Sequence, residues 1–233
     1  MTKIVHPYAH RLGILRDWRS RWFTTDKKKY REFVRTDAAV RKLITNRLHG
    51  NYLSHIEIER SQKELRVQIH TARPGMVIGR SGEGATRLKK DLAQLLKTMK
   101  LSSVPGLHVD IIEVRSPESN AAVVAGMVVE GLEKRLPFRR VLKQTVDKVM
   151  ANRDVKGVRV AVSGMLGAAS MSRKEELKKG RIPLQTFRSD IDFAHDEAHL
   201  PLGKIGVKVW IYRGEVFTEN RAKGNEERRS VSK

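Results

Sequence analysis

The chain has 233 residues, enough for two domains with buried cores, and its 47 lysines and arginines outnumber its 26 acidic residues to give a formal net charge of +21. An excess of this size destabilises a compact chain by self-repulsion unless a polyanion neutralises it, which favours nucleic acid over an anionic membrane surface as the partner. The chain has no cysteine, which excludes disulfides, thiolate nucleophiles and cysteine-based metal sites and is typical of a reducing compartment.

Residues 1–36 are predicted to form a basic N-terminal arm, since cations and aromatic residues occur there without a sustained period. The start, MTKIVHPYAHRLG, has no apolar core of the signal-peptide type, and the longest apolar run, residues 121–129, is far shorter than a membrane span of about 20 residues. We therefore expect a soluble intracellular protein. A basic arm suits insertion along folded RNA, with its rings either stacked on bases or covering the next domain. The arm residues predicted to bind ribosomal RNA are Lys3, His6, Arg11, Arg16, Arg19 and Trp22.

A regular pattern begins at Thr36 and predicts a first domain over residues 37–114. Apolar residues three and four apart indicate a helix that Thr36 caps and Gly50 ends. Two alternating segments, SHIEIER and LRVQIH, predict a β-hairpin with SQKE as its turn. A short helical turn after Pro74, a glycine-rich loop, a longer helix and a strand at 107–114 complete the domain.

The glycine-rich segment PGMVIGRSGEG, residues 74–84, is a candidate phosphate-binding loop. A dinucleotide loop reads G-x-G-x-x-G and a Walker loop ends in G-K-[ST], and this segment matches neither pattern. Helix, GRSG and helix, in this order of elements, resemble a type II KH domain, whose G-x-x-G loop grips the backbone of single-stranded nucleic acid. A glycine-rich turn without a ligand is the alternative. The residues predicted to bind RNA are Gly79, Arg80, Ser81 and Gly82.

Two helices followed by strands predict a second, two-layer α+β domain over residues 115–213. Ser116 is expected to cap a deeply buried helix, and Pro137 to open a second one, PFRRVLKQTVDKVM. The remaining elements are expected as a strand over 155–163, a basic loop over 163–181, strands at 182–193 and 205–213, and a disordered basic tail over 214–233.

A row of cations accompanies the second helix, with Arg135, Arg139 and Lys143 spaced four apart and Arg140 beside them. Such a row is commonly a solvated helical face, but in a chain of this charge we interpret it as a track for phosphates. The basic loop is either solvated or a further RNA-binding segment. Its predicted contacts are Arg173, Lys178 and Arg181.

The segment HDEAH, residues 195–199, places two histidines four apart, but a zinc-protease helix requires H-E-x-x-H. We interpret it as a solvated polar loop. The acidic residues around it lack a recognised metal-ligand spacing, so no metal, cofactor or catalytic site is predicted. The chain is therefore not expected to be an enzyme.

Several long segments resemble the bacterial-type ribosomal protein S three family of the small subunit. KIVHPYAHRLGI, RVQIHTARPGMVIGRSGE, FRR, GRIPLQTFRSDIDF and GVKVWIYRGE follow the family's order and near-identical spacing from residue 3 to about residue 215. The resemblance implies an N-terminal arm, a type II KH domain and an α+β C-terminal domain. It also implies a non-enzymatic protein of the small-subunit head that binds small-subunit ribosomal RNA and neighbours the head proteins S ten and S fourteen.

The resemblance further implies a place at the messenger entry channel, where a basic cluster contacts incoming messenger RNA and aids its unwinding. That cluster falls on Arg139, Arg140 and Lys143. The chain departs from the family at Met165, where the family has arginine, and at Gln144, where it often has a basic residue. The expected location is the ribosome, in the cytoplasm or in an organelle. A free regulatory KH protein is the alternative, although such proteins usually repeat the KH module and this chain has one.

Overall fold

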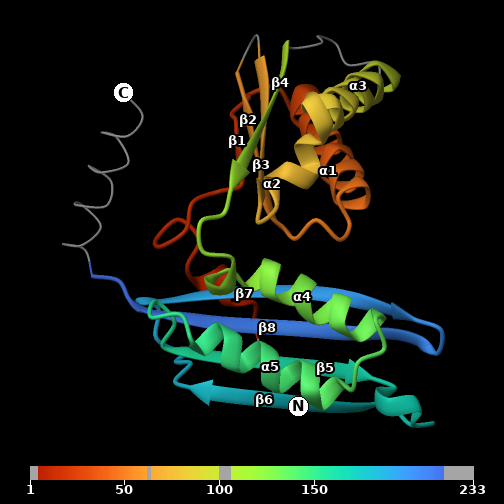
Figure 1. Ribbon diagram of the computed structural model, residues 1–233. Helices are drawn as coiled ribbons and strands as arrows, with labels where there is room; N and C mark the ends of the chain where they lie inside the picture. Colours follow the sequence, from red (N-terminus) through yellow and green to blue (C-terminus); the bar gives the residue numbers. More distant parts are fainter. Residues whose placement is uncertain (1–4, 62–63, 100–105, 218–233) are drawn as a thin grey trace. The chain divides into compact units, whose positions relative to one another are not determined.

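The structure, a computed structural model, describes residues 5–61, 64–99 and 106–217, which belong to two compact units (Figure 1). One unit comprises Trp18–Pro117, and the other combines Met1–Asp17 with Glu118–Lys233. The expected arm over 1–36 is therefore divided between the two units. Lys3 and the predicted tail from residue 218 onward lie outside the described residues. Within the described part of the chain, no helix has the length and apolar character required to cross a bilayer.

The unit of residues 18–117 consists of a four-stranded sheet in the order β1-β2-β3-β4, with helices packed on it (Figure 1). Strands β2 and β3 form the predicted antiparallel hairpin, while β1 pairs with β2 and β4 with β3 in parallel. The order of elements predicted for a type II KH domain is thus present from α1 to β4. The elements are β1 (Ser20–Arg21), α1 (Lys27–Arg47), β2 (Leu53–Arg60), β3 (Glu64–Thr71), α2 (Pro74–Ile78), α3 (Glu83–Thr98) and β4 (Gly106–Glu113).

The predicted start of the first helix is wrong, because α1 begins at Lys27 and not after Thr36. The Asp26 carboxylate caps it by accepting a hydrogen bond from the Lys28 N–H at 2.8 Å. Thr36 lies inside the helix and donates its hydroxyl to the Glu32 carbonyl. The first three residues of α1 are lysines, so they show no apolar spacing from which a helix could be predicted.

Strict alternation along β2 and β3 produces two different faces of the sheet. Ile56, Ile58 and Ile69 are buried in the core formed with the helices. His55, Glu57 and His70 alternate with them and therefore lie on the opposite face.

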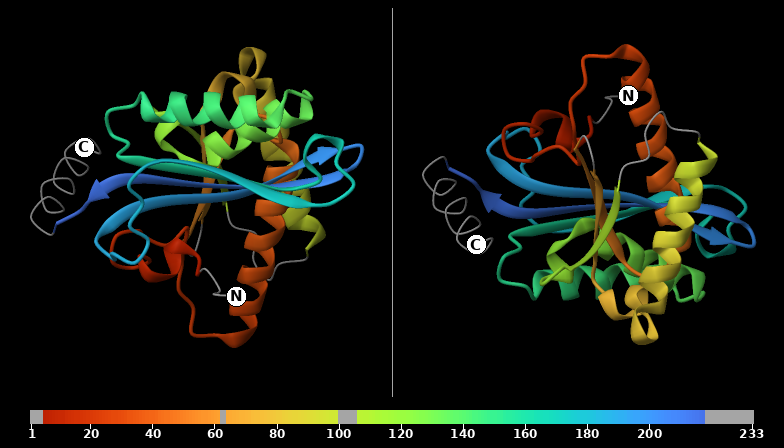
Figure 2. Two further views of the ribbon diagram at one scale, coloured as in Figure 1. Left: turned by 90° about the horizontal axis from the view of Figure 1, so that it is seen from below. Right: turned by 90° about the horizontal axis from the view of Figure 1, so that it is seen from above.

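The unit that contains residues 118–217 has two layers, as predicted. Its antiparallel sheet has the order β6-β5-β8-β7, and two helices lie along one face of it (Figures 1 and 2). Helix α4 packs on β7 and β8, and α5 packs on β5 and β6. The elements are α4 (Ala121–Glu133), α5 (Phe138–Met150), β5 (Gly157–Gly164), β6 (Arg173–Gly180), β7 (Ser189–Leu200) and β8 (Gly203–Glu215).

Three details of this unit differ from expectation. Asn120, not Ser116, caps α4, since its side-chain oxygen accepts from the backbone N–H groups of Ala122 and Val123. Much of the expected basic loop is the edge strand β6, and HDEAH lies in β7. The charged sequence of β6 has little strand propensity of its own, and pairing with β5 along its whole length supplies its backbone hydrogen bonds.

Candidate nucleic-acid interface

The GRSG segment is a tight turn between α2 and α3 with an unusual backbone. Gly79 has φ of 72°, Ser81 52° and Gly82 77°, all in the region that glycine adopts most easily. A Cβ placed on Gly82 would meet nothing within 4 Å, so this part of the turn faces open space. The geometry therefore permits close approach of another backbone at the start of α3.

Gly84, just beyond the turn, serves packing instead. A Cβ there would lie 2.5 Å from the Val77 carbonyl oxygen and 2.9 Å from that of Ile78. Only glycine lets the first turn of α3 rest directly on α2. Gly79 and Gly82 thus shape the turn, whereas Gly84 fixes the helix that follows.

The charges around the turn suit an anion. Arg80 and Ser81 are exposed, and Arg80 has no hydrogen bond or ion pair with any residue that the structure describes. Glu83, in the first turn of α3, pairs with Arg87 one turn later, which offsets its negative charge. The positive end of the α3 dipole adds to the attraction for a phosphate.

Helix α5 separates apolar and cationic residues onto different faces. Leu142, Val146 and Val149 are buried in the core, whereas Arg139, Arg140 and Lys143 are exposed. The predicted amphipathic pattern is therefore present. It lets the sheet hold the helix while its cations remain available to a ligand.

Strand β6 extends this cationic surface beside α5. On the helix side of the strand, Glu175 accepts hydrogen bonds from Arg139 and pairs with Arg173, and Lys179 pairs with Asp147 of α5 at 2.9 Å. We use the name α5–β6 surface for five cations of these two elements, including two that take part in none of these pairs. They are Arg139, Arg140, Lys143, Arg173 and Lys179.

The cations of the α5–β6 surface differ in how firmly they are held. Arg139 reaches Glu175 at 3.4 Å with a side chain that is 71% exposed, a weak arrangement by the usual worth of surface pairs. Arg140 and Lys143 have no ion pair or hydrogen bond with any other described side chain. These two are the most available phosphate ligands of the helix.

Arg135 does not belong to the row on which the four-residue spacing placed it. It lies in the connection before α5, with φ of 59°, so its spacing from Arg139 is not helical. Arg135 instead lines an apolar cavity of about 680 Å³, together with Leu136 and Phe138. Met165 also lines this cavity and contributes apolar surface to it.

The cations predicted for the basic loop lie on or next to β6. Lys178 and Arg181 are exposed and have no ion pair or side-chain hydrogen bond with any residue that the structure describes. Because side chains alternate along a strand, Lys178 faces away from α5 while Arg173 faces toward it. The segment thus offers cations on both sides of the edge strand and is not a single patch.

Arg11 requires a correction, because its side chain is 1% exposed. Its guanidinium donates to four backbone carbonyls, those of Pro7, Leu184, Thr186 and Ser189, at 2.7–3.0 Å. No exposed surface remains with which it could reach a phosphate. We therefore assign Arg11 a structural role in place of the predicted RNA contact.

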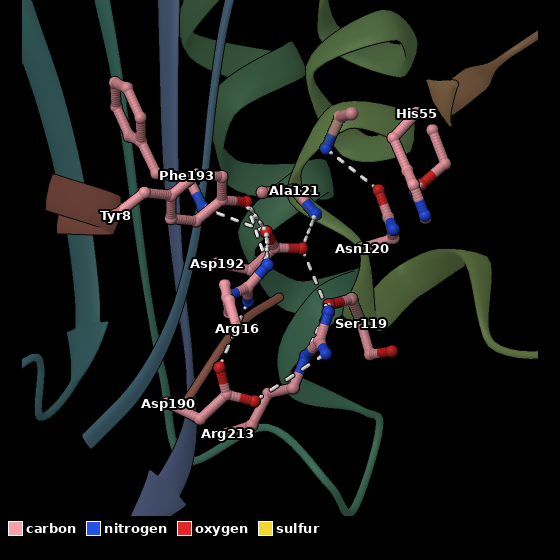
Figure 3. A network of polar contacts seen from close by, with 12 residues as sticks. Tyr8, Arg16, His55, Ser119, Asn120, Ala121, Asp190, Asp192, Phe193 and Arg213 are labelled. Atoms are coloured by element: carbon pink, nitrogen blue, oxygen red, sulfur yellow. Dashed lines mark hydrogen bonds and ion pairs between the residues drawn. The ribbon is translucent and has the colours of Figure 1, made fainter. Parts of the chain in front are cut away.

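Arg16 takes part in a network around the buried carboxylate of Asp192 (Figure 3). Asp192 accepts hydrogen bonds from Arg16 at 3.2 Å, from Arg213 at 2.9 Å, from the Ala121 N–H at 2.9 Å and from the Tyr8 hydroxyl. Asp190 also pairs with Arg16, at 3.1 Å. Arg16 therefore anchors the N-terminal segment to β7, and its guanidinium is paired with two carboxylates of that strand.

The same network shifts two pKa values. Burial alone would raise the pKa of Asp192, but the positive charges of Arg16 and Arg213 outweigh it, and the pKa is lowered below its ordinary value. Burial, reinforced by the charge of Asp192, raises the pKa of Tyr8 to about 12. The network is thus most stable with an ionised Asp192 and a neutral Tyr8.

The other predicted arm residues have mixed environments. Trp22 packs edge-on against Tyr30 and Phe33 and donates its Nε1–H to Asp37 at 2.8 Å. Its ring therefore belongs to the unit of residues 18–117. His6 is exposed and packs against the Phe193 ring, and Arg19 is exposed.

Comparisons with known proteins agree with this architecture. The family described as "KH domain" matches residues 39–119, and the family described as "Ribosomal protein S3, C-terminal domain" matches residues 128–211. The small ribosomal subunit protein uS3 of Caldicellulosiruptor bescii is 44% identical over 222 residues, covering 95% of this chain and 96% of the relative. That of Syntrophomonas wolfei is 42% identical over 226 residues, covering 97% of this chain and 95% of the relative.

The chain belongs to the ribosomal protein S3 family. Membership confirms the resemblance seen in the sequence, the α+β fold class and the KH domain followed by an S3 C-terminal domain. It makes the chain a structural, non-enzymatic small-subunit ribosomal protein.

Proposed function

We propose that this S3-family protein binds small-subunit ribosomal RNA and that Arg139, Arg140 and Lys143 of α5 contact incoming messenger RNA and help to unwind it. The observation that carries the proposal is the exposed, unpaired state of Arg140 and Lys143 on a helix whose opposite face is buried. A rigidly held row of cations can follow a single strand and attract its phosphates without reading its sequence. Holding the phosphates of one strand opposes its return to a duplex, which would favour unwinding.

Contacts with ribosomal RNA are proposed for the KH turn and for the remaining predicted RNA-binding residues. The KH turn combines an open backbone at Gly82 with the unpartnered Arg80, the arrangement that a backbone clamp needs. Arg173, Lys178 and Arg181 on or beside β6, and Arg19, His6 and Lys3 near the N-terminus, are the remaining candidates. Partners S ten and S fourteen, and a cytoplasmic ribosome, are proposed on the resemblance alone.

The test removes the three proposed messenger-binding cations of α5 in the whole particle. Small subunits are reconstituted with the chain carrying Arg139→Ala, Arg140→Ala and Lys143→Ala together. We expect normal co-sedimentation with the subunit, because these side chains are exposed and contribute little to the fold. Translation through a messenger hairpin should slow several-fold relative to an unstructured messenger.

A matched control removes the same charge elsewhere, with Lys27, Lys28 and Lys29 of α1 changed to alanine. These lysines are also exposed, and each variant removes three positive charges. An equal slowing of translation in both variants would mean that the effect comes from the net charge and not from the cations of α5. Loss of subunit assembly in the α5 variant before any hairpin effect would mean that the helix serves ribosomal RNA.

A further inference from the structure

A cluster of three potential metal ligands lies on the sheet of the unit of residues 18–117, outside the nucleic-acid surfaces. His55 and Glu57 are two residues apart on β2, so both project from the same face. His70 of β3 is the direct cross-strand partner of His55 in the antiparallel register. Strand pairing thus gathers residues that are 13 to 15 positions apart in the sequence.

We propose that His55, Glu57 and His70 bind one divalent transition-metal ion of the zinc class. One ligand atom from each residue lies within 4.8 Å of the other two, and His55 Nε2 and Glu57 Oε1 are already 3.2 Å apart. Two imidazoles and one carboxylate are a donor set that zinc and its neighbours accept, with a fourth position left for water.

An unpaired polar atom points independently to a missing ligand. The Nε2 of His70 is buried and has no hydrogen-bond partner among the described residues. An unsatisfied buried nitrogen is unfavourable, and His70 Nε2 is one of seven such side-chain atoms among the described residues. An ion held jointly with His55 and Glu57 would satisfy it.

The surroundings of the cluster also resemble the outer shell of a metal site. Ser54 Oγ lies 2.9 Å from His55 Nδ1, the ring nitrogen that would not bind the ion. Arg21 reaches Glu57 Oε2 at 3.5 Å and leaves Oε1 directed toward His55. Such contacts with the far side of a ligand fix its orientation.

Binding requires a small rearrangement of side chains. The two imidazole rings are stacked, with centroids 4.1 Å apart and planes at 9°, so their in-plane lone pairs lie in nearly parallel planes and do not converge on one ion. With metal–ligand bonds of about 2.1 Å, tetrahedral ligands lie about 3.4 Å apart. One ring must therefore turn and approach the other ligands, while the backbone register stays as it is.

The HDEAH segment of β7 provides a contrast within the same chain. His195, Glu197 and His199 share one exposed face, but successive members on a single strand are about 7 Å apart. Glu197 is also held by Lys204 at 3.0 Å. This segment thus has the same residue types, but they are too far apart to bind one ion together. It is therefore a suitable control for metal binding by the cluster on β2 and β3.

The first experiment titrates the full-length chain with Co²⁺ and follows its visible d–d absorption, then displaces the cobalt with Zn²⁺. We expect one tight equivalent in the wild type. His70→Gln and Glu57→Gln should each weaken binding by at least about tenfold, whereas His195→Gln should leave it unchanged. Equal binding in all four proteins, or no saturable equivalent in the wild type, would overturn the proposal.

A second measurement covers the case in which His70→Gln impairs folding. Side-chain nitrogen NMR of the wild type, with and without Zn²⁺, reports each histidine separately. Zinc should shift the ring signals of His55 and His70 and raise the Tm of the wild type but not that of Glu57→Gln. Shifts confined to His195 and His199 would overturn the proposal. Neither readout involves RNA, so these results are independent of the proposed ribosomal role.

Discussion

Two groups of cations that look alike in the sequence behave in opposite ways in the structure. Arg11 and Arg16, near the N-terminus, are occupied by backbone carbonyls of residues 184–189 and by carboxylates of β7. Arg140 and Lys143, on α5, are exposed and have no partner among the described side chains. Positive charge alone therefore does not identify an RNA contact in this chain. What distinguishes the groups is whether another part of the fold already supplies the acceptors.

The largest loss of stability is expected from removing Arg11, whose guanidinium is used in hydrogen bonds within the fold. Arg11→Ala should lower the free energy of unfolding by about 3–5 kcal/mol, because four buried or part-buried carbonyls lose their donor together. Urea unfolding of the full-length chain measures it. A change below about 1 kcal/mol would show that Arg11 is not structural and would break the comparison.

The next largest loss of stability is expected from replacing Asp192, whose carboxylate lies at the centre of the network. Asp192→Asn should cost about 3 kcal/mol, since Arg16 and Arg213 lose the negative charge that compensates for their desolvation. Asp190→Asn is the matched control, because Asp190 is more exposed and should matter less. Equal losses in the two variants would contradict a central role for Asp192.

A smaller effect is expected at alkaline pH. The folded pKa of Tyr8 is raised from 10.0 to about 12, so folding favours the protonated phenol. Its contribution is complete below pH 10 and is lost as the pH rises toward 12, by on the order of 2 kcal/mol. Unfolding midpoints between pH 9 and 12 measure it. In Tyr8→Phe this part of the pH dependence should disappear, and an unchanged slope would refute the assignment.

The depressed pKa of Asp192 has the opposite sign. Its contribution to stability is complete above the unfolded value of 3.8 and is lost as the pH falls through the lower, folded pKa. Acid unfolding of the wild type and Asp192→Asn should therefore diverge above about pH 4 and converge below it.

The smallest effect on stability should come from the exposed pair. Arg140→Ala with Lys143→Ala should change the free energy of unfolding by less than about 0.5 kcal/mol. The same double variant should weaken binding to single-stranded RNA and reduce the salt slope of log K by about 1.4. Anisotropy titrations at several salt concentrations measure both terms. An unchanged slope would mean that these cations do not contact phosphates.

Much of the fold was predictable where a short period or a local motif determined it. The alternation of Ile56 and Ile58 predicted the hairpin, and the spacing of Leu142, Val146 and Val149 predicted the buried face of α5. The GRSG turn was predictable because its backbone needs glycines at defined positions. The exposed cations Arg139, Arg140 and Lys143 of α5 followed from the same helical pattern, although Arg135 did not belong with them.

Features that depend on distant partners were not predictable. Strand β6 forms because β5 supplies hydrogen bonds along its length, and its charged sequence gives no local sign of it. The structural roles of Arg11 and Trp22 depend on Ser189 and Asp37, which no local pattern connects to them. The histidine cluster likewise arises from strand register, whereas the visible HDEAH motif leaves its ligands apart.

The sequence by itself determined the family, the class of fold and the polyanionic character of the partner, because these depend on motifs, periodicity and net charge. The tertiary structure alone decided which cations are free, which are buried and which side chains meet across strands. The physical reason is that a charge becomes available or committed only when the acceptors around it are known. Those acceptors come from residues that folding brings together across more than 170 positions, as between Arg11 and Ser189.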